Sequence, residues 1–400
     1  MNKRVVIIGG GYAGVRAMQH LSARPYMQVT LIDKNPFHYL QTEAYALIAQ
    51  QATLVDITVD LPALCSSYEN VTFVKADVTG IDFDARRVTA GTRELYYDYI
   101  VLAMGSRTFF PDAIPGLHDY AHGVKSLKNA FRFRQQFERQ LFERMSSEAD
   151  EECRRFNVVV AGAGLSGVEI AAEMADYTRW FMRKNRMLCD NIDVYLIASH
   201  DEVLSGMHPY LKAKAKTRLQ TLGVTVVFGE RVASVEPNTA VLTSGRRVDF
   251  DFMIFAGGII ASKLARSLDV ERNKKGQIAV HPSLAVVGKE DAFAIGDTAD
   301  IRGHDGRPLP ATANGAEKSA ELAVLNILRS NRSEPMVERP IRLEGYMVAL
   351  GRFNAAVVLF DRIRFSGLIG YVMKRLITNR YKFLLDSRAY KAFRRKPEVS

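Results

Sequence analysis

Two groups of three glycines share one spacing in this chain, and that spacing suits one kind of chemistry. The groups are Gly9, Gly11 and Gly14 near the N-terminus and Gly162, Gly164 and Gly167 further along. Between a strand and a helix, glycines at these intervals let the backbone turn tightly, approach a pyrophosphate and pack closely. The N-terminus of the following helix then points free N–H groups at the phosphates. The pattern therefore predicts two dinucleotide sites.

The first loop lies in the sequence context that such a site requires. Residues 4–8 are rich in β-branched side chains, as in a buried parallel strand, and the residues after Gly14 have helical spacing. A second predicted strand ends at Asp33, near the ~20-residue separation at which an acid binds a ribose hydroxyl. These features favour a nucleotide site over a glycine-rich turn without a ligand.

The second loop has the same context but lacks the acid. Residues 158–161 form a predicted strand before the glycines, and a helical pattern and another strand follow. When the two loops are aligned on their glycines, Ala198 takes the place of Asp33. The next residue, Ser199, carries no charge, and no nearby arginine favours a ribose phosphate. We therefore predict a nicotinamide nucleotide here and leave both NADH and NADPH open.

Two dinucleotide sites in one chain indicate electron transfer between cofactors. An enzyme with a single carrier needs one such site and an ordinary substrate pocket. A flavin that accepts hydride from a nicotinamide and serves a second acceptor needs one site for FAD and another for NAD(P)H. We therefore expect an FAD-dependent oxidoreductase.

Three further stretches indicate which loop binds which cofactor. The stretches "DYIVLAMGS" (98–106) and "FDFMIFAGG" (250–258) resemble the crossover strands of two-dinucleotide flavoproteins, and "AFAIGDTAD" (292–300) resembles their second flavin motif. The aspartate of that motif, here Asp297, binds the ribityl chain in the superfamily. The resemblance implies that the N-terminal loop binds FAD.

Within that superfamily the chain most resembles the type II NADH dehydrogenases, which are single-subunit NADH:quinone oxidoreductases. The resemblance extends from Lys3 to about Lys391 and depends on "GGGYAG", "DKNPFHYLQTEAY", "GAGLSGVEIAAEM", "IGDTAD", "PATANGAEKSAELAVLNI" and "GYMVALGRFNAAV". It implies that two electrons pass from NAD(P)H through FAD to a membrane quinone, without proton pumping.

The glycine loops and the resemblance together predict the cofactor contacts. The residues expected around FAD are Gly9, Gly11, Tyr12, Ala13, Gly14, Asp33, Lys34, His38, Ala103, Gly105, Gly296, Asp297 and Ala313. Those expected around NAD(P)H are Gly162, Gly164, Leu165, Ser166, Gly167, Glu169, Ala198, Ser199 and Gly257. No metal site is expected.

Three residues are expected to act near the reacting rings. The family glutamate that matches Glu169 lies near the nicotinamide and the flavin, which implies a positioning role; the alternative is an ordinary polar residue on a helix. The family usually has two glutamines at the quinone end of the flavin, where this chain has Asn314 and Lys318. Both side chains can donate to a quinone carbonyl, and Lys318 can stabilise negative charge on the reduced flavin. The alternative for Lys318 is a solvated surface position.

Most of the excess positive charge lies at the C-terminus. The net charge is +10, and residues 361–400 contain eleven basic and three acidic residues. Helical spacing places Lys374, Arg375 and Lys382 on one face. The opposite, apolar face consists of Leu368, Ile369, Val372, Met373, Leu376, Ile377, Tyr381, Leu384 and Leu385. Such a helix binds an anionic membrane surface; the alternatives are that it covers its own domain or a dimer partner. No nucleic-acid partner is expected, because the rest of the chain is nearly neutral.

We expect an α/β fold with two Rossmann-like dinucleotide-binding domains and a C-terminal amphipathic helical tail. The predicted division is 1–112 and 260–330 for FAD, 113–259 for an inserted NAD(P)H domain, and 331–400 for membrane association or dimerisation. Residues 132–155 are expected to form a charged helical connector.

The expected location is the cytoplasmic side of the inner (plasma) membrane, as a peripheral protein and a homodimer. The glycine loop occupies the first residues, so a cleavable signal peptide is not expected, and no run reaches the ~18–20 apolar residues of a membrane span. Cys65, Cys153 and Cys189 form no CxxC pair and are expected to be reduced thiols. Two alternatives remain: a soluble flavoprotein reductase with a protein or small-molecule acceptor, and a non-enzymatic redox-sensing flavoprotein.

Overall fold

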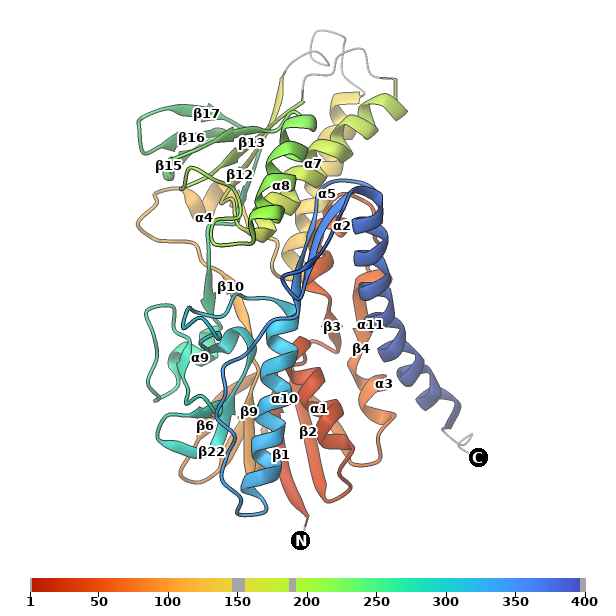
Figure 1. Ribbon diagram of the computed structural model, residues 1–400, viewed down its shortest axis with the longest axis vertical. Coiled ribbons are helices and arrows are strands. Elements are labelled where there is room, and N and C mark those ends of the chain that lie inside the picture. Colours follow the sequence, from red (N-terminus) through yellow and green to blue (C-terminus); the bar gives the residue numbers. More distant parts are fainter. Residues whose placement is uncertain (1, 146–154, 187–191, 396–400) are drawn as a thin grey trace.

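Two largely parallel β-sheets, one for each glycine loop, form the framework of the molecule (Figure 1). The computed structural model describes residues 2–145, 155–186 and 192–395. In the first sheet the strand order is β21 (Ala285–Val286), β22 (Lys289–Ala294), β9 (Tyr99–Leu102), β1 (Lys3–Ile8), β2 (Met27–Asp33) and β5 (Val71–Lys75). Neighbours are parallel except β21 and β22.

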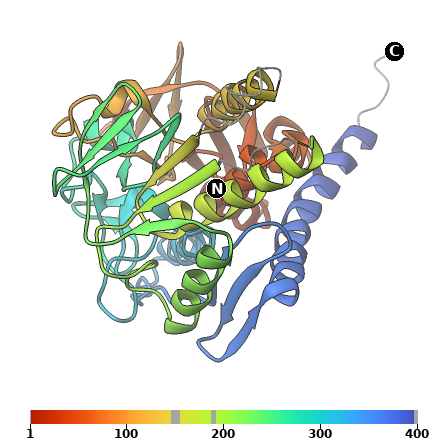
Figure 2. The same ribbon diagram turned by 90° about the horizontal axis from the view of Figure 1, so that it is seen from above.

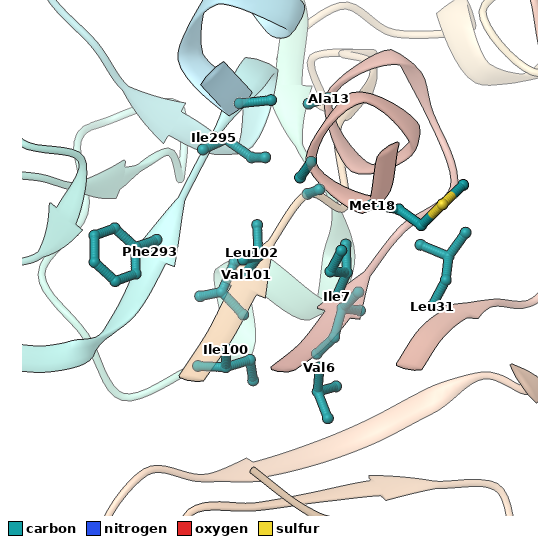
Figure 3. Close-up of a cluster of buried hydrophobic side chains, with 14 of the residues drawn as sticks. Val6, Ile7, Ala13, Met18, Leu31, Ile100, Val101, Leu102, Phe293 and Ile295 are labelled. Atoms are coloured by element: carbon teal, nitrogen blue, oxygen red, sulfur yellow. The ribbon is translucent and has the colours of Figure 1, made fainter. Parts of the chain in front are cut away.

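The first sheet is completed by a strand from a distant part of the sequence. In β22, Phe293 pairs with Val101 of β9. Figure 3 shows these two side chains beside Ile7 of β1, and all three are fully buried. The helices α1 (Tyr12–Ser22) and α10 (Ala313–Ser330) pack against each other beside this sheet. Apolar side chains on neighbouring strands therefore hold the two separate parts of the sequence together.

The second sheet is parallel throughout and contains the second glycine loop. Its order is β11 (Ala121–His122), β18 (Phe252–Phe255), β12 (Phe156–Ala161), β13 (Ile192–Ile197) and β14 (Thr225–Val227). The associated helices are α5 (Leu127–Met145), α7 (Leu165–Lys184) and α8 (Pro209–Thr221). The strands are apolar runs, as expected for a sheet buried on both faces.

Two antiparallel strands join the sheets. β10 (Ser106–Thr108) follows β9, β19 (Ile259–Ala261) follows β18, and Arg107 pairs with Ile260. The chain therefore leaves the first sheet, builds the second and returns. The predicted α/β fold, with one Rossmann-like unit inserted into another, is confirmed.

Short elements complete the two units. Small antiparallel sheets are formed by β3 (Phe37–Tyr39) and β4 (Thr58–Asp60), by β6 (Val78–Asp82), β7 (Arg87–Ala90) and β8 (Arg93–Tyr96), and by β15 (Val232–Glu236), β16 (Thr239–Leu242) and β17 (Arg247–Asp249). A parallel pair is formed by β20 (Ile278–Ala279) and β23 (Ala299–Asp300). The remaining short helices are α2 (Ala44–Ile48), α3 (Leu61–Ser66), α4 (Leu117–Tyr120) and α9 (Lys263–Ser267).

The C-terminal region contains a small sheet as well as the predicted helix. The antiparallel strands are β24 (Gly345–Ala349), β25 (Ala355–Leu359) and β26 (Ile363–Ser366), and α11 (Gly367–Arg395) follows. Figure 2 shows α11 at the edge of the molecule beside these strands. The sequence predicted only a helical tail.

The predicted orientation of α11 is wrong in part. Lys374, assigned to the solvent face, is only 6% exposed, whereas Leu368 and Leu376 are 62% and 60% exposed. Leu385, which was placed on the apolar face, is buried against the protein. Lys374 faces inward because it has a buried acidic partner on the main body of the molecule, which the helical pattern of the tail cannot indicate.

Two smaller predictions have mixed outcomes. Cys65 is a buried free thiol, whose pKa is raised to about 12 by burial, and Cys153 and Cys189 lie outside the described residues. The predicted connector is helical in α5, but Phe133 and Phe137 bury one side of that helix; residues 146–154 lie outside the described part.

Within the described part of the chain, no helix combines the length and the apolar character that crossing a membrane requires. The same residues contain no group of three or more side chains suited to holding a metal ion.

Candidate active site

The first glycine loop is built so that larger side chains do not fit. Gly9 has φ +107°, and a Cβ atom there would lie 2.3 Å from the carbonyl oxygen of Ala103. A Cβ atom on Gly14 would lie 1.8 Å from the carbonyl oxygen of Gly9. The strand, the turn and α1 therefore approach this closely only with glycine at both positions.

Space remains open at the middle glycine, Gly11. No protein atom lies within 4 Å of a Cβ atom built there, and Gly11 is the N-cap of α1. No side chain of the described residues caps this helix end, so its first N–H groups are available to a ligand. Open space beside free donors at a helix N-terminus fits a pyrophosphate.

Asp33, at the end of β2, is fixed at the side of this loop. Its Oδ2 accepts a hydrogen bond from the N–H of Gly10 at 2.7 Å, and its Oδ1 accepts one from the N–H of Asn35 at 2.7 Å. Burial raises the pKa of this carboxyl group, and the two backbone donors oppose the shift. The predicted ribose-binding acid is thus held rigidly beside the phosphate position.

Asp297 borders the same loop from a turn at residues 296–298. A Cβ atom on Gly296 would lie 3.2 Å from Ala13 of α1, so this turn packs against the first glycine loop. Asp297 Oδ2 accepts hydrogen bonds from Ser106 Oγ at 2.5 Å and Lys125 Nζ at 2.9 Å. Sequence reasoning missed Lys125, because nothing in its local sequence indicates this distant partner.

Other residues predicted around FAD lie on elements that meet here. The Gly105 N–H donates to Thr298 Oγ1 at 2.7 Å, which ties the end of β9 to the Asp297 turn. Ala103 is buried against the glycine loop, and Ala313 begins α10. Lys34 is exposed after β2.

An aromatic cluster joins the first loop to the C-terminal helix. The rings of Tyr12 and His38 meet edge to face at 4.8 Å between centroids, and Tyr381 of α11 lies 5.3 Å from Tyr12. The Tyr381 hydroxyl is 3.1 Å from His38 Nε2. Burial lowers the pKa of His38 to about 4, so this histidine is neutral at physiological pH. Tyr381 was not predicted as a site residue.

The second glycine loop repeats the geometry of the first. Gly162 has φ +114°, and a Cβ atom there would lie 2.6 Å from the backbone of Ala256. A Cβ atom on Gly167 would lie 1.7 Å from the carbonyl oxygen of Gly162. A Cβ atom built on Gly164 would meet no protein atom within 4 Å. Gly164 is the N-cap of α7, which begins with Leu165 and Ser166, and no side chain of the described residues caps this helix end. This loop also fits a pyrophosphate.

The second loop differs from the first beside the expected ribose. Ala198 follows β13 and is buried, and Ser199 is exposed. Ala198 makes two backbone hydrogen bonds: its N–H donates to the Val227 carbonyl at 2.8 Å, and its carbonyl accepts the Glu230 N–H at 3.1 Å. Gly257 lies after β18 against the ring of Phe255. A nucleotide here meets no carboxylate at the position that Asp33 has in the first loop.

Two glutamates follow the second loop on one side of α7. Glu169 Oε1 accepts the N–H of Ala349 in β24 at 3.0 Å, and burial raises its pKa to about 7. Glu173, one turn later, is 2% exposed, accepts a hydrogen bond from Gln51 Nε2, and has a pKa raised by burial to about 8. Both carboxyl groups therefore change protonation near neutral pH. Glu173 was not predicted.

A buried cation completes this group. Lys374 of α11 donates to Glu43 Oε1 at 2.9 Å and to the Tyr45 hydroxyl. The positive charge of Lys374 lowers the pKa of Glu169, although burial outweighs it. The C-terminal helix thus contributes charge to the interior beside the second loop.

Asn314 and Lys318 lie in the first turns of α10 and are both held by Glu344. Asn314 Oδ1 accepts the Glu344 N–H at 2.9 Å. Lys318 Nζ lies 2.7 Å from Glu344 Oε1 and 3.4 Å from Glu321 Oε2. The hydrogen bond to Glu344 is the largest influence that raises the pKa of Lys318. Asn314 and Lys318 therefore form a polar cluster with Glu344, the residue that precedes β24.

These features define a flavoprotein oxidoreductase with two glycine loops that suit nucleotides. The family model for pyridine nucleotide-disulphide oxidoreductases matches residues 3–320, and the chain belongs to that family. Its predicted likeness to type II NADH:quinone oxidoreductases is also confirmed.

Similar proteins cover nearly the whole chain. A demethylphylloquinone reductase, NdbB, of Synechocystis sp. is 27% identical over 94% of this chain and 91% of its own. A type II NADH:quinone oxidoreductase of Staphylococcus saprophyticus is 26% identical over 96% of both chains. The structure of NDH2 from Plasmodium falciparum in complex with NADH matches with a TM-score of 0.85 at 16% identity, over 98% of both chains.

Proposed function

We propose that this protein oxidises NAD(P)H with FAD and passes two electrons to a membrane quinone, without pumping protons. The observation that carries the proposal is the pair of matching loops, each with an open glycine beside an uncapped helix N-terminus. Two similar curated proteins are a quinone reductase and an NADH:quinone oxidoreductase, which supports the same acceptor class. We also propose the domain division 1–112 and 260–330, 113–259 and 331–400.

The first loop is the proposed FAD site. Bound FAD would accept two electrons and a proton from the nicotinamide and return the electrons to an acceptor. The N–H groups at Gly11 would bind the pyrophosphate, Asp33 the ribose and Asp297 the ribityl hydroxyls. Lys125 and Ser106 already bind Asp297, so they would hold its carboxylate in one orientation.

The second loop is the proposed NAD(P)H site. The N–H groups beyond Gly164 would bind the nucleotide pyrophosphate. Because Ala198 offers neither a carboxylate that repels a 2′-phosphate nor a cation that attracts one, we propose that both NADH and NADPH are accepted.

The chain can hold the proton that quinone reduction consumes. A quinone needs two electrons and two protons to become a quinol, and hydride supplies only one proton. Glu169, with its pKa near 7, can carry the other, and Glu173 behind it can replace that proton. Asn314 and Lys318 are the proposed donors to a quinone carbonyl, in the first turns of α10, where the helix dipole favours negative charge.

The proposed membrane surface is the outer side of α11, and we propose a peripheral position on the cytoplasmic face of the membrane. Leu368, Ile369 and Leu376 are more than half exposed there, and Arg375 and Arg380 lie among them. Apolar side chains beside basic ones suit an anionic bilayer surface. The exposed stripe of α11 consists of Leu368, Ile369, Val372 and Leu376. A second copy of the chain could cover this stripe, so a homodimer is the second proposed association.

The direct test is an anaerobic titration of the purified yellow protein with NADH and with NADPH. We expect both to bleach the flavin absorbance, and a short-chain quinone to restore it. A colourless protein that does not retain added FAD would overturn the proposal.

A soluble reductase with another acceptor is the second candidate. It is favoured by the Lys318–Glu344 ion pair, which occupies the position where the resembling family has glutamine. Sedimentation with vesicles separates the two candidates. Replacement of Leu368, Ile369 and Leu376 by serine should release the protein from anionic vesicles, while NADH should still bleach the flavin. Deleting α11 is less informative, because Lys374 and Tyr381 pack into the interior.

A further inference from the structure

A basic hollow lies where the ends of α7 and α8 meet the turn between β24 and β25. Its volume is about 590 Å³. It is lined by Asp176, Arg179, Trp180, Arg183, Lys184, Arg218, Thr221, Leu222, Arg352 and Phe353. The proposed electron transfer uses none of these side chains.

The charge in this hollow is strongly unbalanced. Of the described residues that line it, five are cations and Asp176 is the one acid. Asp176 Oδ2 already accepts the backbone N–H of Arg352 at 2.7 Å. Among the residues that the structure describes, none of the five cations has a carboxylate within ion-pair distance. The hollow therefore attracts an anion.

Three arginines are held in place, and within the described part of the chain most of their donors have no partner. Arg218 Nε donates to the Leu350 carbonyl at 3.0 Å, and Arg179 Nη1 donates to the Thr221 carbonyl at 3.4 Å. The Arg352 guanidinium stacks 4.5 Å from the ring centre of Trp180. A guanidinium has five N–H donors, so each arginine keeps several for a ligand. Planar, positioned guanidinium groups suit phosphate.

Helix ends alone do not account for this charge. Basic residues commonly stabilise helix C-termini, and α7 and α8 both end here. Two helix ends together amount to roughly one negative charge. With Asp176, that leaves about three positive charges unbalanced.

The hollow opens beside the exposed stripe of α11. Phe353 at its rim is 58% exposed, and its ring meets that of Tyr371 on α11 at 5.5 Å. Leu368 and Val372 of the stripe lie within one turn of Tyr371 and are exposed. A phosphate bound in the hollow would thus sit beside apolar side chains, as a phospholipid headgroup does in a membrane.

We propose that this hollow binds the phosphate of an anionic phospholipid headgroup at the membrane surface. The proposal deepens the membrane contact suggested above and rests on it for the source of the phosphate. The binding itself requires no electron transfer.

Trp180 makes the test direct, because it is the only tryptophan in the chain. Its emission would be recorded while the yellow protein is titrated with three probes: phosphatidylcholine vesicles, the same vesicles containing phosphatidylglycerol, and soluble glycerol phosphate. We expect a saturable change with phosphatidylglycerol vesicles, a weaker one with glycerol phosphate, and none with phosphatidylcholine. A response to glycerol phosphate alone would overturn the lipid source, and no response to either phosphate would overturn the site.

The test variant is the double substitution Arg179→Gln with Arg352→Gln. The matched control is Arg246→Gln, on the turn between β16 and β17, which lies away from α11 (Figure 1). Each charge removed from the hollow should weaken binding about fivefold, while R246Q should bind like the parent. Equal binding by the double variant would overturn the proposal. Bleaching by NADH, measured on the same samples, reports separately on the proposed function.

Discussion

Lys374 and Glu43 form a buried ion pair between the C-terminal helix and the short turn before α2. Nζ and Oε1 are 2.9 Å apart, and the two residues are 6% and 5% exposed. Thr378, one turn later, donates to the same Glu43 oxygen at 3.3 Å. The helix proposed to meet the membrane is thus fixed to the interior by charge as well as by packing.

Replacement of Lys374 by methionine should destabilise the protein by about 3–5 kcal/mol, because Glu43 then keeps a buried negative charge without an opposite charge beside it. Denaturant unfolding with a tryptophan or flavin signal measures this. The control, Lys391→Met on the exposed end of α11, should change stability by less than about 0.5 kcal/mol. The double variant E43Q/K374M should recover part of the loss. If K374M is as stable as the parent, the pair does not anchor the helix.

Glu173 makes stability depend on pH. The folded chain keeps the Glu173 proton up to about pH 8, whereas the unfolded chain releases it near the ordinary value of 4.5. The free energy of unfolding should therefore fall as pH rises from about 4.5 to 8. Glu173→Gln, which stays neutral, should remove the Glu173 contribution, leave that of Glu169, and stabilise the protein at pH 8.5 by up to about 5 kcal/mol. Parallel denaturation curves of parent and variant at every pH would contradict the assignment.

Glu169 should instead affect turnover. If it holds the proton for the quinone, quinone reduction by the parent should decline above about pH 7 as this carboxyl group ionises. Glu169→Gln should abolish that decline and lower kcat about 10²-fold at neutral pH. Stopped-flow reoxidation of the reduced protein by a short-chain quinone measures the step. Glu290→Gln, on the exposed surface of β22, is the control, because it should keep the pH-dependent decline; an unchanged profile for E169Q would remove Glu169 from the proton path.

Features that depend on neighbouring residues, such as the glycine loops, could be predicted from the sequence. Contacts between side chains far apart in the sequence could not. The glycine loops were predictable because turn, strand and helix all follow from neighbouring residues. The Glu43–Lys374 pair joins residues 331 positions apart, and no local pattern indicates it. The helical pattern of α11 placed Lys374 on the polar face and Leu385 on the apolar face, but both side chains turn inward. Lys125 was missed for the same reason, because Asp297 meets it only after the second sheet has been inserted.

Replacement of Lys125 should lower the affinity for FAD, although Lys125 is not proposed to contact the nicotinamide. Its ammonium group lies 2.9 Å from Asp297 Oδ2, so Lys125→Met would leave that carboxylate less well oriented toward the ribityl hydroxyls. We expect FAD affinity to fall about tenfold, in line with the loss of one charge-assisted hydrogen bond. Flavin release during dialysis, followed by absorbance, measures it. The control, Lys128→Met on the exposed side of α5, should retain FAD like the parent. If K125M retains FAD equally well, Asp297 does not need Lys125 to be oriented.

Gly164 offers a test of the second cradle that leaves the fold intact. A Cβ atom at Gly164 meets no protein atom within 4 Å, so Gly164→Ala should unfold at nearly the parent temperature and keep its yellow colour. The methyl group would instead occupy the space proposed for the pyrophosphate, and KM for NADH should rise about tenfold or more with FAD still bound. The comparison variants are Gly80→Ala in β6, where a Cβ atom is also accommodated, and Gly167→Ala, which collides with the Gly162 carbonyl and should destabilise the second sheet. An unchanged KM for G164A would mean that the nucleotide does not bind at this helix N-terminus.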